Sequence, residues 1–176
     1  MPRLNILCRT AVVPMLLAAL LLLTQVPAQA AIPIQHWVHA SGARVYLVTS
    51  PSIPMLDVQL GFDGGARRDP KGMEGLINAS AALLTAGVAA QPGQPALDEN
   101  ALSEAWVDTG AQFGAQVNAD QFSVSLRTLT EPALLDRAVA LAARQLAAPA
   151  WPEAVWQRER QRWLASLKEA ETRPAT

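Results

Sequence analysis

The sequence has very little cysteine and histidine. Its 176 residues include one cysteine, Cys8, and two histidines, His36 and His39. Cys8 lies in the N-terminal segment 1–31, which has the pattern of a cleaved signal peptide. The mature chain, residues 32–176, is therefore predicted to have no disulfide, no thiolate metal site and no cysteine nucleophile.

The sequence also lacks a cluster of Lys and Arg residues. The formal net charge is −1, and no stretch gathers Lys and Arg into a basic patch. Binding of nucleic acid needs clustered cations that neutralise phosphates. We therefore expect no nucleic-acid partner.

Segment 1–31 has the three parts of a secretory signal. Arg3 and Arg9 give a basic start, an apolar run covers residues 11–23, and small residues at 28–30 offer a cleavage site. The run is shorter than the ~20 residues that cross a bilayer, which favours cleavage over an uncleaved N-terminal anchor. The sequence thus predicts a periplasmic or secreted protein with no stable membrane insertion after cleavage.

The remaining residues have the pattern of one α+β domain. Short strands are predicted on both sides of Ser41-Gly42, and a half-buried strand over residues 56–62 has its apolar face at Leu56, Val58, Leu60 and Phe62. Helices are predicted over 73–86, with Gly87 as the C-terminal cap, and over 98–108, with Asp98 as the N-terminal cap and Gly110 past the end. Strands are predicted over 111–117 and 121–129, and further helices open near Pro132 and Pro152. This order favours a mainly antiparallel sheet covered by helices.

The last helix is predicted to be amphipathic. Its buried face is assigned to Trp156, Trp163 and Leu167. Its solvated face is assigned to five charged residues: Arg158, Glu159, Arg162, Lys168 and Glu169.

Four stretches carry a family resemblance. They are "GARVYLVTS" (42–50), "VQLGFDGGARRDPKGMEGLINASAALLTAGV" (58–88), "VDTGAQFGAQVNADQFSVSLRTL" (107–129) and "VWQRERQRWLASLKEAETRP" (155–174). In this order they resemble the N-terminal domain of the pitrilysin/insulinase (M16) family of zinc metallopeptidases. The resemblance is to the non-catalytic kind that lacks the inverted zinc motif. Family domains are longer, so residues 32–176 are expected to be a partial, truncated domain with an incomplete fold.

The resemblance also locates the family's zinc positions. Active members carry His-x-x-Glu-His on the helix after the glycine turn, where the histidines share a metal and the glutamate is the general base. The aligned residues are Asn78, Ala81 and Ala82. Ser166 falls at the third ligand, seven residues after Glu159. The resemblance therefore implies no catalytic residue, no metal site and no zinc cofactor of the kind that active members use.

Other residues offer weak substitutes for that site. His36 and His39 are three apart in a predicted strand, which sends their side chains to opposite faces and disfavours a shared metal. Ser80 stands among alanines without a nearby base and is interpreted as a packing residue.

Substrate-binding residues are implied at Gly114, Ala115 and Gln116. Family members hold peptide as an added strand on a sheet edge, and Gly114-Ala115 stands where the family has Asn-Ala. The alternative is an ordinary strand in which Gly114 eases a close contact.

We therefore expect a catalytically inactive, peptide-binding partner subunit of an active M16-family zinc peptidase in the periplasm. The expected partners are that active subunit and an extended peptide. Two alternatives stay open: an active zinc metalloendopeptidase with a displaced site, and a non-functional fragment of a longer two-domain protein.

Overall fold

The computed structural model describes residues 33–172, so the predicted signal peptide, residues 1–31, lies outside the described residues. The chain divides into two units, one ending at Pro51 and one beginning at Ser52. Within residues 33–172, no helix combines the length and apolar character needed to cross a bilayer.

The first unit contains an antiparallel hairpin. Strand β1 (Ile34–Val38) pairs with β2 (Arg44–Val48), with His36 opposite Tyr46. The amide of Gly42, which has a φ of 88°, donates to the carbonyl oxygen of His39 at 2.8 Å. This positive φ suits glycine, and the predicted turn at Ser41-Gly42 is confirmed.

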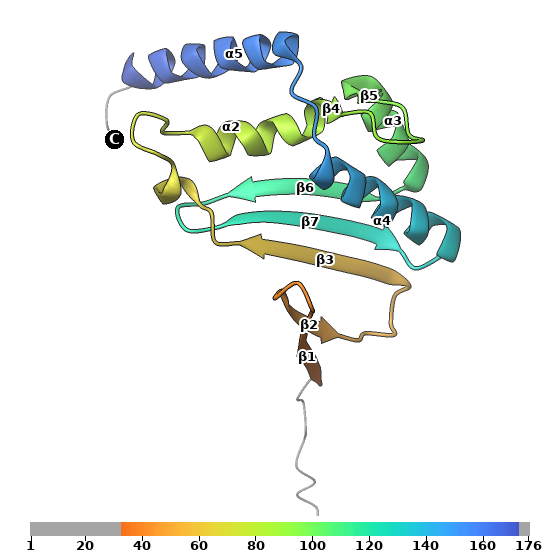
Figure 1. Ribbon diagram of the computed structural model, residues 1–176. Coiled ribbons are helices and arrows are strands. Elements are labelled where there is room, and N and C mark those ends of the chain that lie inside the picture. Colours follow the sequence, from red (N-terminus) through yellow and green to blue (C-terminus); the bar gives the residue numbers. More distant parts are fainter. Residues whose placement is uncertain (1–32, 173–176) are drawn as a thin grey trace, which may run out of the picture. The chain divides into compact units, whose positions relative to one another are not determined.

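The second unit is built on a three-stranded antiparallel sheet (Figure 1). Its strands are β3 (Met55–Phe62), β7 (Phe122–Leu129) and β6 (Gln112–Val117), in the order β3-β7-β6. Leu126 of the central strand lies opposite both Val58 and Phe113. The α+β class and the antiparallel sheet are thus as predicted.

Helices cover one face of this sheet. Helix α4 (Pro132–Ala147) contacts β7, and α2 (Leu76–Leu83) contacts β6. Ala138 and Ala142 of α4 are buried against Leu126, because alternate residues of β7 point to the same face. Helical coverage therefore concentrates on the central strand and on β6.

The predicted apolar face of β3 is covered only in part. Leu56 and Val58 are half-buried, whereas Leu60 and Phe62 are 40% and 47% exposed. β3 is an edge strand of this sheet, on the side away from α2. The period-2 pattern correctly predicts the strand and its face, but it does not show how far a helix extends over it.

Helix α2 is shorter than the predicted helix over 73–86. Gly75, with a φ of 95°, directly precedes it, and a 3-10 turn (Leu84–Ala86) follows. The carboxylate of Asp69 accepts hydrogen bonds from the amides of Gly75 and Ile77, at 2.8 and 3.1 Å. This carboxylate satisfies amides that a helix start leaves unpaired, and the left-handed conformation of Gly75 keeps residues 73–75 out of the helix.

Gly87 follows the helical segment as predicted, as the C-cap residue of the 3-10 turn and not of α2 itself, and it also begins a strand. Strand β4 (Gly87–Val88) pairs with β5 (Leu97–Asp98), a pair that the sequence analysis did not predict. A Cβ at residue 87 would lie 2.6 Å from the carbonyl oxygen of Leu97. The pairing thus requires glycine at this position.

Helix α3 (Glu99–Thr109) has the predicted caps. The side chain of Asp98 accepts from the amide of Ala101 at 2.8 Å, and Gly110 has a φ of 62°. At the α3–α4 contact, the indole of Trp106 donates to the fully buried Gln145 at 2.8 Å. Gln145 in turn donates to the carbonyl oxygen of Leu84 at 2.8 Å, so one amide joins three segments.

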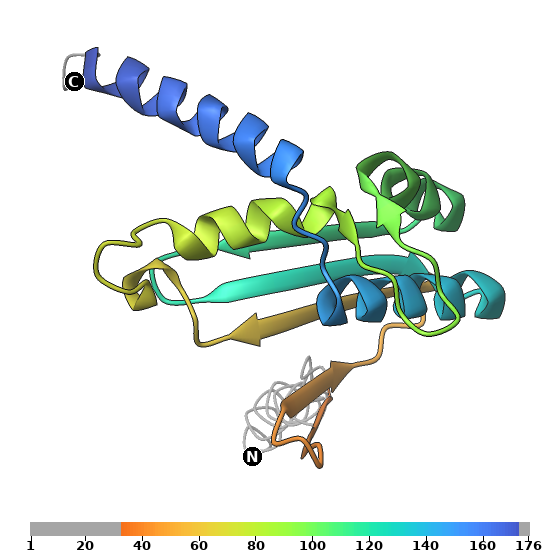
Figure 2. The same cartoon turned by 45° about the horizontal axis from the view of Figure 1, so that its top comes forward.

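Helix α5 (Glu153–Thr172) has no buried residue, and the prediction of a buried face is wrong for it. Trp156 and Trp163 are half-buried, while Leu167 is 62% exposed. Figure 2 shows that α5 begins near the C-terminal end of α2 and diverges from the sheet toward its own C-terminal end. Its apolar residues Trp156, Trp163 and Leu167 line a cavity instead of packing into the core.

Candidate functional site

A cavity of about 700 Å³ lies between α2 and α5; it is called the α2–α5 groove below. The wall from α2 and the loop before it is formed by Met73, Glu74, Gly75, Leu76, Asn78, Ala79 and Ala82. The wall from α5 is formed by Trp156, Trp163, Ser166 and Leu167.

The groove brings together three of the four residues at the family's zinc positions. Asn78 and Ala82, four apart on α2, lie on one wall, and Ser166 of α5 lies on the other. Ala81 is half-buried and is not among the lining residues. Two segments far apart in the sequence thus meet where the resemblance placed a metal site.

The donor atoms in the groove do not fit zinc. Zinc in proteins is bound by Cys, His, Asp and Glu, whereas Ala82 offers a methyl group and Asn78 and Ser166 offer a neutral amide and a hydroxyl. The one carboxylate in the lining is Glu74, and its Oε1 accepts from the amide of Gly72 at 3.1 Å. Within residues 33–172, no three His, Cys, Asp or Glu side chains are grouped as a metal site would require.

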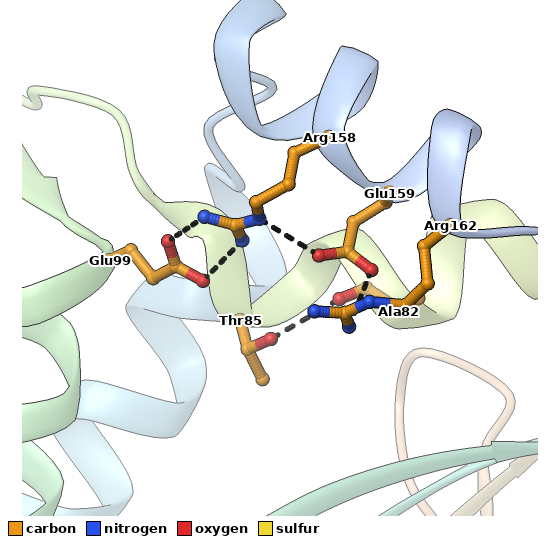
Figure 3. Close-up of polar contacts among 6 residues, drawn as sticks. All are labelled: Ala82, Thr85, Glu99, Arg158, Glu159 and Arg162. Atoms are coloured by element: carbon orange, nitrogen blue, oxygen red, sulfur yellow. Dashed lines mark hydrogen bonds and ion pairs between the residues drawn. The ribbon is translucent and has the colours of Figure 1, made fainter.

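An ion-pair network joins α5 to the N-terminal end of α3 (Figure 3). The guanidinium of Arg158 donates to both carboxylate oxygens of Glu99, at 2.8 and 3.0 Å. It also contacts Glu159 at 3.1 Å, and Arg162 contacts the other oxygen of Glu159 at 3.0 Å. We call these four residues the arginine clasp.

The arginine clasp changes the interpretation of the charged face of α5. The side chain of Glu159 is only 13% exposed, so its assignment to a solvated face is wrong. The two arginines cover its carboxylate, which a helix pattern alone does not show. The hydrogen bond from Arg158 is the main cause that lowers the pKa of Glu99 below its usual value, with the charge of Arg158 adding to it.

The predicted substrate-binding residues lie on an edge strand. β6 pairs with β7 on one side, and no other described strand pairs with it. Gly114 and Ala115 are half-buried and Gln116 is exposed. Ala115 lies opposite Val124 on the helix-covered face, and a Cβ at Gly114 would lie 3.2 Å from Oγ of Ser125. Gly114 therefore eases a close contact, as the alternative interpretation holds, and β6 also lies beside α2.

The side chains weighed as substitutes for the zinc site, those of His36, His39 and Ser80, make local contacts outside the α2–α5 groove. His36 stacks on Tyr46 with ring centroids 6.1 Å apart, whereas Nδ1 of His39 lies 2.9 Å from Oγ of Ser41. Oγ of Ser80 donates to the carbonyl oxygen of Leu76 at 2.9 Å, a local bond typical of a serine within a helix. Each of these side chains therefore has a partner in its own hairpin, turn or helix.

Comparisons with known proteins found similarity in structure. Neither the family models nor the curated proteins gave a match. The crystal structure of a peptidase M16 inactive domain from Pseudomonas fluorescens matches with a TM-score of 0.73 and 28% identity, over 80% of this chain and 32% of that one. The periplasmic protease PqqL from Escherichia coli matches with a TM-score of 0.68 and 19% identity, over 82% of this chain and 15% of that one. Pitrilysin matches with a TM-score of 0.61 and 24% identity, over 83% and 15%.

The chain thus spans about a third of the length of the Pseudomonas protein and less of the other two. The described chain has the fold of the pitrilysin/insulinase (M16) peptidase family.

Proposed function

We propose that this chain is a catalytically inactive M16-fold subunit that acts beside an active zinc peptidase. The observation that carries the proposal is the α2–α5 groove. Asn78, Ala82 and Ser166 meet there on a retained scaffold, and their side chains do not provide a zinc site. Without a metal or a general base, the peptide bond cannot be hydrolysed by the metal-assisted route of this fold.

Two further observations support the proposal. The Pseudomonas protein that matches this chain is described as an inactive domain. The N-terminal segment has the pattern of a secretory signal, and the matching Escherichia coli protein is described as a periplasmic protease. We therefore place the proposed subunit in the periplasm.

We also propose that the subunit holds extended peptide along β6, at Gly114, Ala115 and Gln116. Strand addition uses backbone N–H and C=O groups, so it does not depend on a metal. β6 is an edge strand among the described residues and is therefore suited to this mode of binding.

The test mixes the purified mature chain with an active M16-fold peptidase of the same organism. We expect the two to co-elute in size-exclusion chromatography, and the turnover of a peptide substrate to change at a fixed peptidase concentration. An unrelated chain of similar size serves as the control. Separate elution together with unchanged turnover would overturn the partner role.

A further inference from the structure

We propose that a pocket between α3, α4 and the segment leading into β5 binds a linear dicarboxylate, with one carboxylate at Arg137 and the other at Arg144. It is called the α3–α4 pocket below. The proposal goes beyond the proposed function and is independent of it, because no residue of this pocket lines the α2–α5 groove or belongs to β6.

The α3–α4 pocket has two positive charges and no negative one. Arg137 and Arg144 line it, and no Asp or Glu does. Arg137 is exposed and has no ion-pair or hydrogen-bond partner among the described residues. Four other arginines of the described chain are each paired with a carboxylate: Arg67, Arg68, Arg127 and Arg158. The pocket therefore lacks a counter-ion that the rest of the fold supplies elsewhere.

The guanidinium of Arg144 is held in position by the fold. Its Nη2 donates to the carbonyl oxygen of Pro95, in the loop between β4 and β5 that reaches α4 (Figure 2). Its Nε is buried and has no hydrogen-bond partner within residues 33–172. A buried donor without an acceptor costs free energy, and an unoccupied ion site is one explanation for it. A carboxylate has two acceptor oxygens that match the planar guanidinium.

The spacing of the two arginines selects an anion with two separated negative groups. They are seven residues apart on α4, which places them on one face of the helix and about 10 Å apart along its axis. Four apolar side chains also line the pocket: Leu97, Ala105, Ala140 and Leu141. A diacid with an aliphatic chain would place its methylene groups against these side chains and its carboxylates at the two arginines.

The size of the pocket favours a small free molecule over a protein segment. Its volume is about 370 Å³, near the lower end of the range for small-ligand sites. A peptide with two acidic side chains offers the same carboxylates, but its backbone needs additional room. The free diacid therefore fits the pocket better, and the acidic peptide is one arm of the test.

The test measures binding to the whole mature chain by isothermal titration calorimetry at low salt. The main probe is suberate. Succinate is a shorter diacid, inorganic phosphate has no apolar part, and octanoate has the chain length of suberate with one carboxylate. We expect succinate and phosphate to bind at least about 10-fold more weakly than suberate, because they lack methylene groups that the pocket buries. Octanoate should bind about 3-fold to 10-fold more weakly, because it pairs with one arginine only.

The variant Arg137→Gln locates the second carboxylate. Because Arg137 is exposed and unpaired in the described chain, its replacement should not disturb the fold. It should weaken suberate about 3-fold to 10-fold and change octanoate by less than about 2-fold, so that the two ligands bind almost equally. The matched control is Arg160→Gln, which removes the same charge at an exposed position of α5 and should leave both affinities unchanged.

Three results overturn the proposal. The first is equal affinity of the wild type and Arg137→Gln for suberate. The second is phosphate binding as tightly as suberate, which would mean attraction by charge alone. The third is no binding at about 10 mM suberate, since a molecule of this size binds a fitting site more tightly than that.

The peptide arm separates the two sources of paired carboxylates. The probe is acetyl-Glu-Ala-Ala-Glu-amide, which we expect to bind at least about 10-fold more weakly than suberate, because the pocket is at the small end of ligand sites. Tighter binding of this peptide than of suberate would overturn the assignment to a free diacid and would assign the pocket to an acidic protein segment.

Discussion

At the scale of single residues, the α2–α5 groove can be tested by restoring the ligands it lacks. Asn78, Ala82 and Ser166 line it together, and residues 78 and 82 share one face of α2. We predict that the triple variant Asn78→His, Ala82→His, Ser166→Glu binds one zinc per chain, whereas the wild type binds far less. Elemental analysis after chelation and reloading measures both stoichiometries.

The matched control moves one histidine off that face. Asn78→His, Ser80→His, Ser166→Glu has the same donor types, but positions two apart on a helix do not face each other. Equal zinc content in the two triple variants would show that the groove does not have the geometry of the family's site. One tightly bound zinc in the wild type would make His36 and His39 the next residues to mutate.

A second prediction at this scale concerns Gln145. Its side chain is fully buried, accepts from Trp106 and donates to the carbonyl oxygen of Leu84. Gln145→Leu leaves a donor and an acceptor without partners inside the fold. We expect the free energy of unfolding to fall by about 2–4 kcal/mol, as buried unsatisfied groups cost. Urea denaturation measures it, and Gln161→Leu, at an exposed position of α5, should change it by less than about 0.5 kcal/mol.

Residues such as Gln145 and Glu159 mark the limit of what the sequence could predict. Local rules correctly predicted the Asp98 cap, the Gly110 end of α3 and the turn at Ser41-Gly42, because each depends on neighbouring residues. The partners of Gln145 come from segments 39 and 61 residues away. Such pairings depend on tertiary packing, which no periodicity reports.

The same limit applies to the candidate site. The family alignment named Asn78, Ala82 and Ser166, and the structure places them in one groove. The sequence could not show that Trp156 and Trp163 face that groove, since an amphipathic pattern does not distinguish a buried core from an open cavity. Nor could the sequence show that the carboxylate of Glu159 is paired with both Arg158 and Arg162.

At the scale of elements, the arginine clasp is the main described polar link between α5 and the helices over the sheet. α5 buries no residue, so the link at Glu99 has little apolar packing to support it. We predict that Arg158→Met increases amide hydrogen exchange across α5 while changing the free energy of unfolding by less than about 1 kcal/mol. Hydrogen exchange with mass spectrometry measures this, and Arg160→Met is the control on the same helix. Equal exchange in both variants would mean that the clasp does not hold α5.

The clasp also gives a pH dependence with a defined sign. Arg158 lowers the pKa of Glu99 in the folded state. Its contribution is therefore present above the ordinary glutamate pKa of about 4.3 and is lost as the pH falls through the lowered value. Both partners are substantially exposed, so we expect only about 0.5 kcal/mol after solvent screening.

The measurement compares the wild type with Arg158→Met by urea denaturation at several pH values. Their difference in unfolding free energy should be constant above about pH 5 and should shrink below about pH 4. Asp57, Asp63 and Glu74 also have lowered pKa values, but they are unchanged in both proteins and cancel in the comparison. A difference that grows as the pH falls would contradict the ion pair.

At the scale of the whole molecule, the described sheet presents two edge strands. β3 and β6 each have one strand neighbour within residues 33–172. Unpaired backbone groups along such edges favour association with another chain or with a peptide. The purified chain is therefore expected to self-associate, and a peptide that occupies β6 should reduce that association.

We predict that sedimentation velocity of the mature chain shows oligomers whose fraction rises with concentration. Acetyl-Ala-Ala-Leu-Lys-Ala-amide in excess should lower that fraction, because it occupies the backbone groups of Gly114, Ala115 and Gln116 that a second chain would otherwise use. The matched control is the same peptide with N-methyl groups on alternate residues, which keeps its side chains but removes the amide protons needed for pairing. If both peptides dissociate the oligomers equally, the effect comes from contacts of the peptide's side chains and not from backbone pairing with β6. If neither does, β6 is not the edge through which the chain associates.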